Sequence, residues 1–385
     1  PSGDFKYKKI IKKDSTGEII SDKGPFSAKC IKFVPDNDNN CSFIVKEVPV
    51  GIDFHWSHSE ELEYKGELEV MIGNSGLLTS VNIIDIESYL KSVNSSEMRN
   101  DNNIEMLKAQ TVAARGTVLA TMGKHHFSDG YDLCADDHCQ CYQGTKRITD
   151  ISNIVTETTE GEVLMFDNKF CDTRYSKICG GITEKYSTCW EDMDFPYLPA
   201  ISDDCDKTIF RKPMDEIEAE KFIKNNDLEC YCNTYKYKLP GSLKFSKDLF
   251  RWEEEIASVE IKDNLLRKFD RNIGDILDII PMERGYSGRI SKLNVVGTDG
   301  ETIISKELNI RRLLSASHLP SSAFIIRKTG NKYILKGAGW GHGVGLCQIG
   351  AQIMGEQGIS YKDILKHYYK GSVLKKIVPE INSGP

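Results

Sequence analysis

The chain has 385 residues, of which 39% are hydrophobic and 28% are charged, and its net charge is −7. This composition is typical of a soluble globular protein with room for two or three domains. No basic stripe appears, which argues against a nucleic-acid partner, and no apolar stretch is long enough to span a bilayer. The sequence starts at Pro1 without a signal peptide, and such a start carries no information about export.

Residues 1–80 predict β structure. Apolar and polar residues alternate in segments 41–50 and 62–72, and turn-forming residues occupy 36–40 and 73–76. We therefore expect an N-terminal β module that leads into a strand at 76–84.

Two helices are predicted between residues 85 and 125, separated by a polar break at 99–103. Asn102 or Asn103 is placed to cap the second helix. Glu97 lies where the first helix ends. A carboxyl group at such a junction can be partly shielded from water, which favours its protonated form and suits it to general-acid catalysis. The alternative is an ordinary solvated glutamate.

The second helix carries an apolar stripe, and Gln110 and Arg115 flank that stripe. We expect both side chains to face the same junction as Glu97, where they would bind substrate.

Twelve cysteines are many for this length, and three of them crowd into residues 134–141. Cys134, Cys139 and His138 supply the sulfur and nitrogen donors that Zn²⁺ prefers, and His126 or His125 would complete a tetrahedral site. The alternative is a disulfide beside a surface histidine. Cys141 is expected to remain a free thiol.

Tyr142 and Gln143 follow the cysteine cluster directly and precede Gly144. An aromatic ring stacks on a sugar face and an amide bonds to hydroxyl groups, so both residues are candidates for glycan binding. A β-turn with a packed tyrosine is the alternative.

Residues 151–178 predict strands around a turn at Asp167-Asn168, ended by Gly180-Gly181. The composition then changes over 203–285, where a charged helix at 215–226 and a strand with a helix at 251–269 indicate an inserted region.

The remaining elements are two hairpins, at 288–305 and 323–336, and two final helices at about 346–356 and 361–369. We therefore predict an α+β fold with an antiparallel β-rich core and a central two-helix element that carries Glu97. The expected domains are a β module at 1–80, a core at 81–202 and 286–385, and an inserted α/β subdomain at 203–285.

Glycine occupies every second position from 339 to 345, around Trp340 and His342. Glycines let a ligand approach the backbone closely, so Trp340 is expected to stack on a sugar and His342 to bond substrate or Glu97. The alternative is a glycine-rich turn. Cys347 follows five residues after His342, but a catalytic Cys–His pair usually comes from separate segments.

Four stretches resemble the stage II sporulation protein D / LytB (SpoIID/LytB) family. They are SSEM with LKAQTVAAR (95–98 and 107–115), CADDHCQCYQG (134–144), YSKICGG (175–181) with PYL (196–198), and WGHGVGLCQIGA (340–351). They occur in the family's order and cover the chain from about residue 80 to its end. Features of the inserted region, including Cys232 and Arg251-Trp252, resemble one branch of the family.

The resemblance implies a lytic transglycosylase that acts on peptidoglycan glycan strands, with Glu97 as the catalytic acid and base. It supports zinc as a cofactor, adds Ser176 and Gln348 to the expected substrate contacts, and implies an extracytoplasmic location. A second hypothesis is a non-catalytic wall-binding protein that enhances a cell-wall amidase. A third is a cysteine hydrolase using Cys347.

Overall fold

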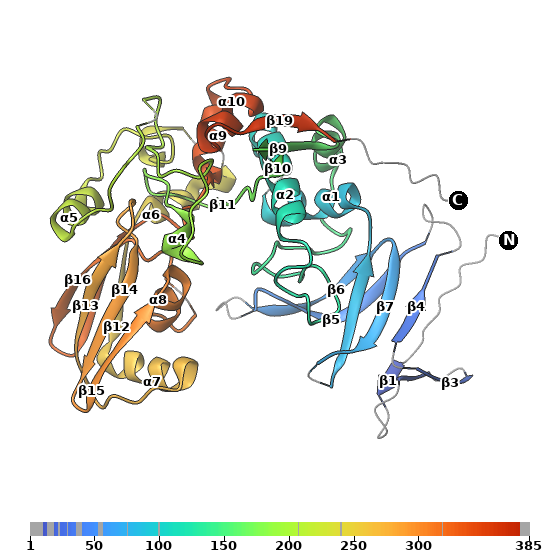
Figure 1. Ribbon diagram of the computed structural model, residues 1–385, viewed down its shortest axis with the longest axis horizontal. Helices are drawn as coiled ribbons and strands as arrows, with labels where there is room; N and C mark the ends of the chain where they lie inside the picture. Colours follow the sequence, from blue (N-terminus) through green and yellow to red (C-terminus); the bar gives the residue numbers. More distant parts are fainter. Residues whose placement is uncertain are drawn as a thin grey trace. The chain divides into compact units, whose positions relative to one another are not determined.

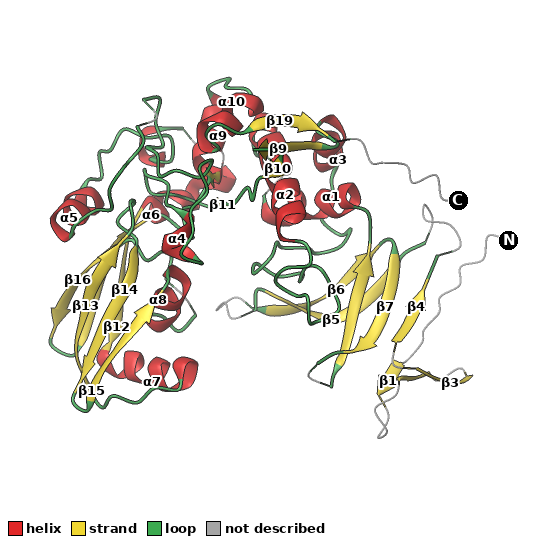
Figure 2. Cartoon of the chain, in the orientation of Figure 1, coloured by secondary structure: helices red, strands yellow, loops and turns green. Residues whose placement is uncertain are grey.

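The computed structural model describes residues 11–13, 19–21, 24–28, 30–35, 41–52, 57–74, 76–98, 101–206, 208–238, 241–317 and 319–377. The chain forms two compact units. The first contains residues 1–52, 57–97 and 121–149, and the second contains residues 53–56, 98–120 and 150–385. Helices and mostly antiparallel strands give the α+β fold that the sequence predicts (Figures 1 and 2). Among the helices described, none is both long and apolar enough to cross a membrane.

The first unit is built from short antiparallel strands and one helix. The β structure predicted for the start of the chain is present, and the turn predicted at 36–40 lies outside the described residues. The strands form the sheets β1-β2-β3 and β4-β7-β8 and the hairpin β5–β6. Their bounds are β1 (Ile11–Lys13), β2 (Ile19–Ser21), β3 (Gly24–Ala28), β4 (Cys30–Phe33), β5 (Phe43–Val50), β6 (His58–Tyr64), β7 (Glu67–Ile72) and β8 (Leu78–Ile83).

Helix α1 (Ile86–Glu97) follows β8 and ends at the predicted junction. It buries Tyr89, Leu90 and Val93, which recur at the spacing of one helix face. Asp85 begins the helix, because its carboxylate accepts the N–H of Ser88 at 2.9 Å. Helix α1 therefore has a buried face that extends to Val93, one turn before its end at Glu97.

The second unit is centred on helix α2 (Ile104–Thr121). Only the last residue of this helix, Thr121, belongs to the first unit. Asn103 caps the helix, because its side-chain oxygen accepts the N–H of Glu105 at 2.9 Å. The predicted cap is thereby resolved in favour of Asn103. Helix α2 is buried along most of its length because Met106, Ala109 and Val112 are fully enclosed.

The elements around α2 come from the middle and the end of the chain, and in Figure 1 α9, α10 and β19 lie together. Strands β10, β9 and β19 form one sheet, and β11 pairs in parallel with β18. The bounds are α3 (Asp150–Thr158), β9 (Glu162–Phe166), β10 (Lys169–Phe170), β11 (Tyr175–Ser176), α4 (Tyr186–Cys189), β18 (Leu346–Cys347), α9 (Gln348–Glu356), α10 (Tyr361–Tyr368) and β19 (Val373–Lys376).

Helix α3 corrects the sequence prediction, which placed strands from residue 151 onward. The segment is rich in β-branched residues, but its apolar residues recur at helical spacing and bury Val155 against the core. The predicted turn at Asp167-Asn168 is confirmed. Both residues have positive φ, 47° and 59°, as the tight hairpin between β9 and β10 requires.

A second sheet region of this unit packs on its own core. Two antiparallel sheets, β12-β17-β16 and β13-β14-β15, enclose buried residues such as Trp252, Leu293 and Tyr333. The bounds are α5 (Glu216–Lys224), η1 (Thr234–Lys236), η2 (Gly241–Ser246), α6 (Lys247–Phe250), β12 (Arg251–Ala257), α7 (Ser258–Phe269), β13 (Ile276–Arg284), β14 (Ile290–Gly297), β15 (Gly300–Ser305), α8 (Glu307–Leu313), β16 (Phe324–Thr329) and β17 (Lys332–Ala338).

The strands of the inserted region pair with strands outside that region. Strand β12 lies within 203–285 and pairs with β17, and β13 pairs with β14 across the boundary expected at 285. The inserted residues and the C-terminal part therefore share one hydrophobic core.

Candidate active site and metal centre

Glu97 is the last residue of α1 and is half-buried. Its Oε1 accepts the backbone N–H of Cys141 at 3.1 Å. Burial, and then the negative charge of Glu97, raise the pKa of the Cys141 thiol well above its ordinary value, so this thiol keeps its proton. Cys141 is therefore the free thiol that the sequence predicts. Its backbone N–H, not its thiol, holds the carboxyl group of Glu97 through this hydrogen bond.

The loop 134–141 brings together the four predicted metal ligands. One donor atom from each of His126, Cys134, His138 and Cys139 lies within 4.8 Å of the others. His138 Nδ1 is 3.8 Å from the sulfur of Cys134 and 3.7 Å from that of Cys139. Hydrogen bonding with Cys139, and then with His138, lowers the pKa of Cys134 well below its ordinary value despite burial. No disulfide joins these cysteines.

Two features of His126 fit a metal ligand. Its Nε2 is buried without a hydrogen-bond partner, while its Nδ1 contacts Asp129 Oδ2 at 2.9 Å. A histidine that binds metal commonly donates its other ring nitrogen to a carboxylate, which fixes the ring. The donor set of two sulfurs and two nitrogens suits a tetrahedral Zn²⁺. Sequence reasoning missed Asp129, although its spacing of three residues from His126 was visible.

Tyr142 is placed for packing, which corrects its assignment as a sugar platform. Its ring is buried and lies 4.9 Å from that of Tyr89, and its hydroxyl donates to Asn82 at 2.5 Å. Gly144 has a φ of +64°, and a Cβ there would lie 2.1 Å from the carbonyl oxygen of Glu63. The motif therefore docks the loop on β6. Gln143 is half-buried beside it and stays a candidate contact.

The remaining candidates belong to the second unit. Gln110 and Gln348 are buried and meet each other, with Gln348 Nε2 donating to Gln110 Oε1 at 3.3 Å. Arg115 is fully buried and donates to the carbonyl oxygen of Glu162 at 3.0 Å. A guanidinium with no exposed surface cannot contact a glycan in this conformation. The structure therefore corrects the prediction that Arg115 binds substrate, and shows instead a buried side chain that hydrogen-bonds the backbone of β9. A substrate role for the glutamine pair stays a prediction.

The backbone conformation of the loop 339–345 explains why it is rich in glycine. Gly339, Gly341, Gly343 and Gly345 all have φ between 72° and 91°, a region that residues with a Cβ rarely adopt. The guanidinium of Arg289 fills the space beside Gly343 and donates to the carbonyl oxygen of Gly341 at 3.0 Å. The group that approaches this backbone is therefore part of the protein.

Arg289 is a buried organising residue that sequence reasoning missed. It also donates to the carbonyl oxygen of Cys179 and to the hydroxyl of Ser287. Ser287 in turn donates to the buried carboxylate of Glu184 at 2.7 Å. Nothing in the local pattern of RGYSGRI marks Arg289 as a residue that organises a distant loop, so only the folded chain identifies it.

His342 is held inside the same loop. Its Nδ1 accepts the N–H of Val344 at 3.0 Å, and its ring lies 4.7 Å from that of Trp190. Burial, and then the charge of Arg174, hold the pKa of His342 well below its ordinary value, so the imidazole is neutral. His342 therefore helps to hold the loop through its ring contact with Trp190 and its hydrogen bond to Val344, and its expected role toward substrate stays a prediction.

Trp340 and Ser176 are placed on adjoining backbone of the second unit. Trp340 is half-buried and exchanges two backbone hydrogen bonds with Ile178. Ser176 pairs with Cys347 in the β11–β18 ladder, and its hydroxyl is buried without a partner. Both remain candidates. Cys347 is completely buried, so it cannot serve as the accessible nucleophile of a cysteine hydrolase.

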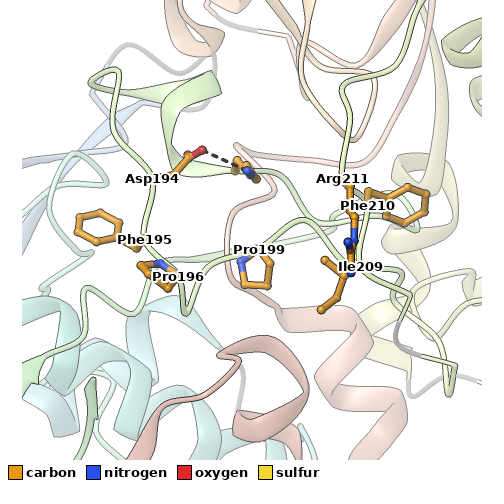
Figure 3. A pocket seen from close by; sticks show the side chains of 8 residues that line it. Asp194, Phe195, Pro196, Pro199, Ile209, Phe210 and Arg211 are labelled. Atoms are coloured by element: carbon orange, nitrogen blue, oxygen red, sulfur yellow. Dashed lines mark ion pairs between the residues drawn. The ribbon is translucent and has the colours of Figure 1, made fainter. Parts of the chain in front are cut away.

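A pocket of about 410 Å³ opens beside the PYL motif (Figure 3). Phe195 and Pro196 lie on one side of it, and Phe210 and Arg211 lie on the other. Lys185 and Asp194 form an ion pair of 3.3 Å at its rim. Its mixed aromatic and charged lining offers a surface for a ligand.

The fold and the site define an α+β protein in which a cysteine- and histidine-rich loop positions a carboxyl group at a helix end. Residues 74–166 match the family described as Stage II sporulation protein, and residues 184–345 match a domain of unknown function (DUF8618). Residues 74–166 are therefore similar to the SpoIID family, and the resemblance of the chain to the SpoIID/LytB family is confirmed.

Three relatives illustrate the similarity. The amidase enhancer of Bacillus subtilis is 28% identical over 74% of this chain and 40% of its own length. Stage II sporulation protein D of Bacillus amyloliquefaciens is 26% identical over 76% of this chain and 74% of its own length. An uncharacterized protein of Brachyspira hyodysenteriae is 28% identical over 91% of this chain and 88% of its own length.

Proposed function

We propose that this chain is an extracytoplasmic lytic transglycosylase that cleaves MurNAc–GlcNAc bonds in peptidoglycan glycan strands. The observation that carries the proposal is the half-buried Glu97 at the end of α1, held by the N–H of Cys141. Its position within the matched SpoIID region and the relatives named Stage II sporulation protein D support the assignment.

In the proposed reaction, Glu97 acts first as an acid and then as a base. Its carboxyl proton passes to the glycosidic oxygen as the bond from that oxygen to C1 of MurNAc breaks. The C6 hydroxyl of the same sugar then bonds to the positively charged C1 and returns its proton to Glu97. The products are a 1,6-anhydro end and a free hydroxyl on the leaving sugar. Because the nucleophile belongs to the substrate, no second carboxylate is required.

His126, Cys134, His138 and Cys139 are the residues that would hold zinc in this enzyme. The metal would supply a structural cross-link within the loop. That loop ends at Cys141, whose N–H hydrogen-bonds Glu97, so a fixed loop would orient the carboxyl group for proton transfer.

Replacing Glu97 tests the proposal. Glu97→Gln keeps the shape of the side chain but cannot transfer the proton, so we expect the fold to persist and cleavage to disappear. Glu160→Gln, an exposed glutamate after α3, is the matched control. Mass spectrometry of the products from glycan strands stripped of stem peptides detects 1,6-anhydro ends. Activity above about a tenth of wild type in Glu97→Gln would contradict the assignment.

The second candidate function is enhancement of a cell-wall amidase, which the name of one relative favours. A purified amidase acting on intact peptidoglycan separates the two possibilities. If stimulation of the amidase is unchanged in Glu97→Gln and wild type releases no anhydro ends, the chain acts as an enhancer and not as a transglycosylase.

A further inference from the structure

The second unit contains another cluster of metal-type ligands, completely enclosed by protein. The sulfurs of Cys179, Cys232 and Cys347 and a carboxylate oxygen of Asp203 all lie within 4.8 Å of one another. None of the four residues is more than 1% exposed. They come from four separate segments: the loop after β11, the loop before α5, the loop between α5 and η1, and the N-cap of α9.

We propose that Cys179, Asp203, Cys232 and Cys347 bind a structural Zn²⁺, separate from the ion proposed for the first unit. Zinc in structural sites is tetrahedral, with sulfur ligands at about 2.3 Å, which places neighbouring ligand sulfurs about 3.8 Å apart. Cys179 and Cys232 already have their sulfurs at 3.6 Å. This pair therefore has nearly the spacing of two sulfur ligands on one zinc ion.

Backbone N–H groups point at the sulfurs, as they do where a thiolate carries negative charge. Cys347 is the N-cap of α9, and its sulfur accepts the N–H of Gly350 at 3.4 Å and that of Cys179 at 3.2 Å. The sulfur of Cys179 accepts the N–H of Gly181 at 3.4 Å. Two of the three sulfurs thus accept hydrogen bonds from backbone N–H groups.

Asp203 is oriented in the same way. One carboxylate oxygen accepts the N–H of Cys232 at 3.0 Å, and the other accepts the hydroxyl of Tyr368 at 2.6 Å. Within the described part of the chain, Asp203 forms no ion pair with a basic side chain. A buried carboxylate without a cation is costly, and a divalent metal at the centre of the cluster would supply the missing charge.

Three thiolates and one carboxylate would leave the zinc site with net negative charge, and a nearby arginine offsets it. Arg251 is half-buried, and its Nη1 donates to the carbonyl oxygen of Gly180, next to Cys179 along the chain. Burial lowers the pKa of Arg251 to about 10, and the neighbouring Cys232 and Cys230 act in the opposite direction. The guanidinium therefore stays charged at neutral pH.

Metal content tests the proposal without reference to cleavage. The double variant Cys134→Ser/Cys139→Ser removes the first cluster and serves as the background. This double variant is purified without added metal under reducing conditions. We expect inductively coupled plasma mass spectrometry to find one zinc per chain. Adding Cys232→Ser should abolish this zinc. Adding Cys171→Ser, which changes a thiol that is equally buried but lies outside the cluster, should leave it in place.

Two further measurements cover the case in which Cys232→Ser fails to fold. Asp203→Asn preserves the shape of the side chain and should release zinc faster to a chelator than the background does. Reconstitution of the background with Co²⁺ should give the strong visible bands of a tetrahedral thiolate site. If the folded background binds no zinc even after titration with Zn²⁺, the proposal is overturned. A Cys179–Cys232 disulfide in protein alkylated at lysis would also overturn it.

Discussion

The backbone N–H of Cys141 donates to Oε1 of Glu97 across 3.1 Å, so the end of a ligand-rich loop sets the orientation of the carboxyl group. The neighbouring Gln140 is held as well, because its Oε1 accepts the hydroxyl of Tyr89 at 3.1 Å. Both contacts lie within the first unit and join the loop to α1. The conformation of the loop 134–141 and the orientation of the Glu97 carboxyl group are therefore coupled.

The first prediction separates the backbone of Cys141 from its side chain. Cys141→Ala removes the thiol but keeps the N–H that bonds Glu97, so we expect glycan cleavage to fall by no more than about tenfold, the equivalent of one ordinary hydrogen bond. Initial rates of 1,6-anhydro product release measure this effect. A loss as complete as that of Glu97→Gln, with the fold intact, would show that the thiol itself takes part.

The second prediction concerns Asp129, whose carboxylate contacts Nδ1 of His126 at 2.9 Å. Asp129→Asn should weaken zinc binding at the first cluster by about 10–100-fold, because the carboxylate orients the ring and raises its basicity. Competition with a chromogenic chelator measures the affinity. Asp132→Asn changes an exposed carboxylate three residues further along the chain and is the control. Equal affinities in the two variants would show that Asp129 does not orient His126 for metal binding.

The third prediction is that His342 supports stability. His342→Gln removes the acceptor for the N–H of Val344 and the ring that contacts Trp190, so we expect a loss of about 2 kcal/mol in the free energy of unfolding. Denaturant titration measures this loss, and cleavage per folded molecule should be assayed on the same protein. Unchanged stability with lost turnover would instead place His342 in the chemistry.

The same residue should make stability depend on pH. Because the folded-state pKa of His342 lies well below 6.5, the unfolded chain binds more protons than the folded chain in the interval between them. The contribution is fully present above pH 6.5 and is lost as the pH falls toward the folded-state pKa. Between about pH 7 and about pH 5, wild type should therefore lose more stability than His342→Gln. Parallel curves for the two proteins would contradict this.

The fourth prediction compares two glycines with similar backbone conformations but different surroundings. A Cβ at Gly343 would lie 2.5 Å from the guanidinium of Arg289, whereas a Cβ at Gly330 would meet nothing within 4 Å. Gly330→Ala should cost about 1 kcal/mol for its positive φ, and Gly343→Ala about 3 kcal/mol or more because the buried arginine must also move. Thermal unfolding of both variants measures the difference. Equal costs would mean that Arg289 adapts freely.

The local elements of this protein follow from its sequence. The period of apolar residues placed α1 and α2, the polar break ended α1 at Glu97, and Asp167-Asn168 made the turn between β9 and β10. These features depend on neighbours within a few residues, where helix period, caps and turn chemistry act. The cluster of His126, Cys134, His138 and Cys139 was predictable for the same reason, because its ligands lie close together along the chain.

Only the tertiary structure determined the roles of side chains whose contacts are distant in sequence. Tyr142 and Arg115 are polar-tipped residues beside functional motifs, and only the packing around them shows that one is stacked in a core and the other anchors a carbonyl oxygen. Cys179 and Cys347 are 168 residues apart, and no local pattern records that their backbone and sulfur meet. Such contacts form because buried polar groups must find partners once the chain encloses them, and the partner is set by the whole fold.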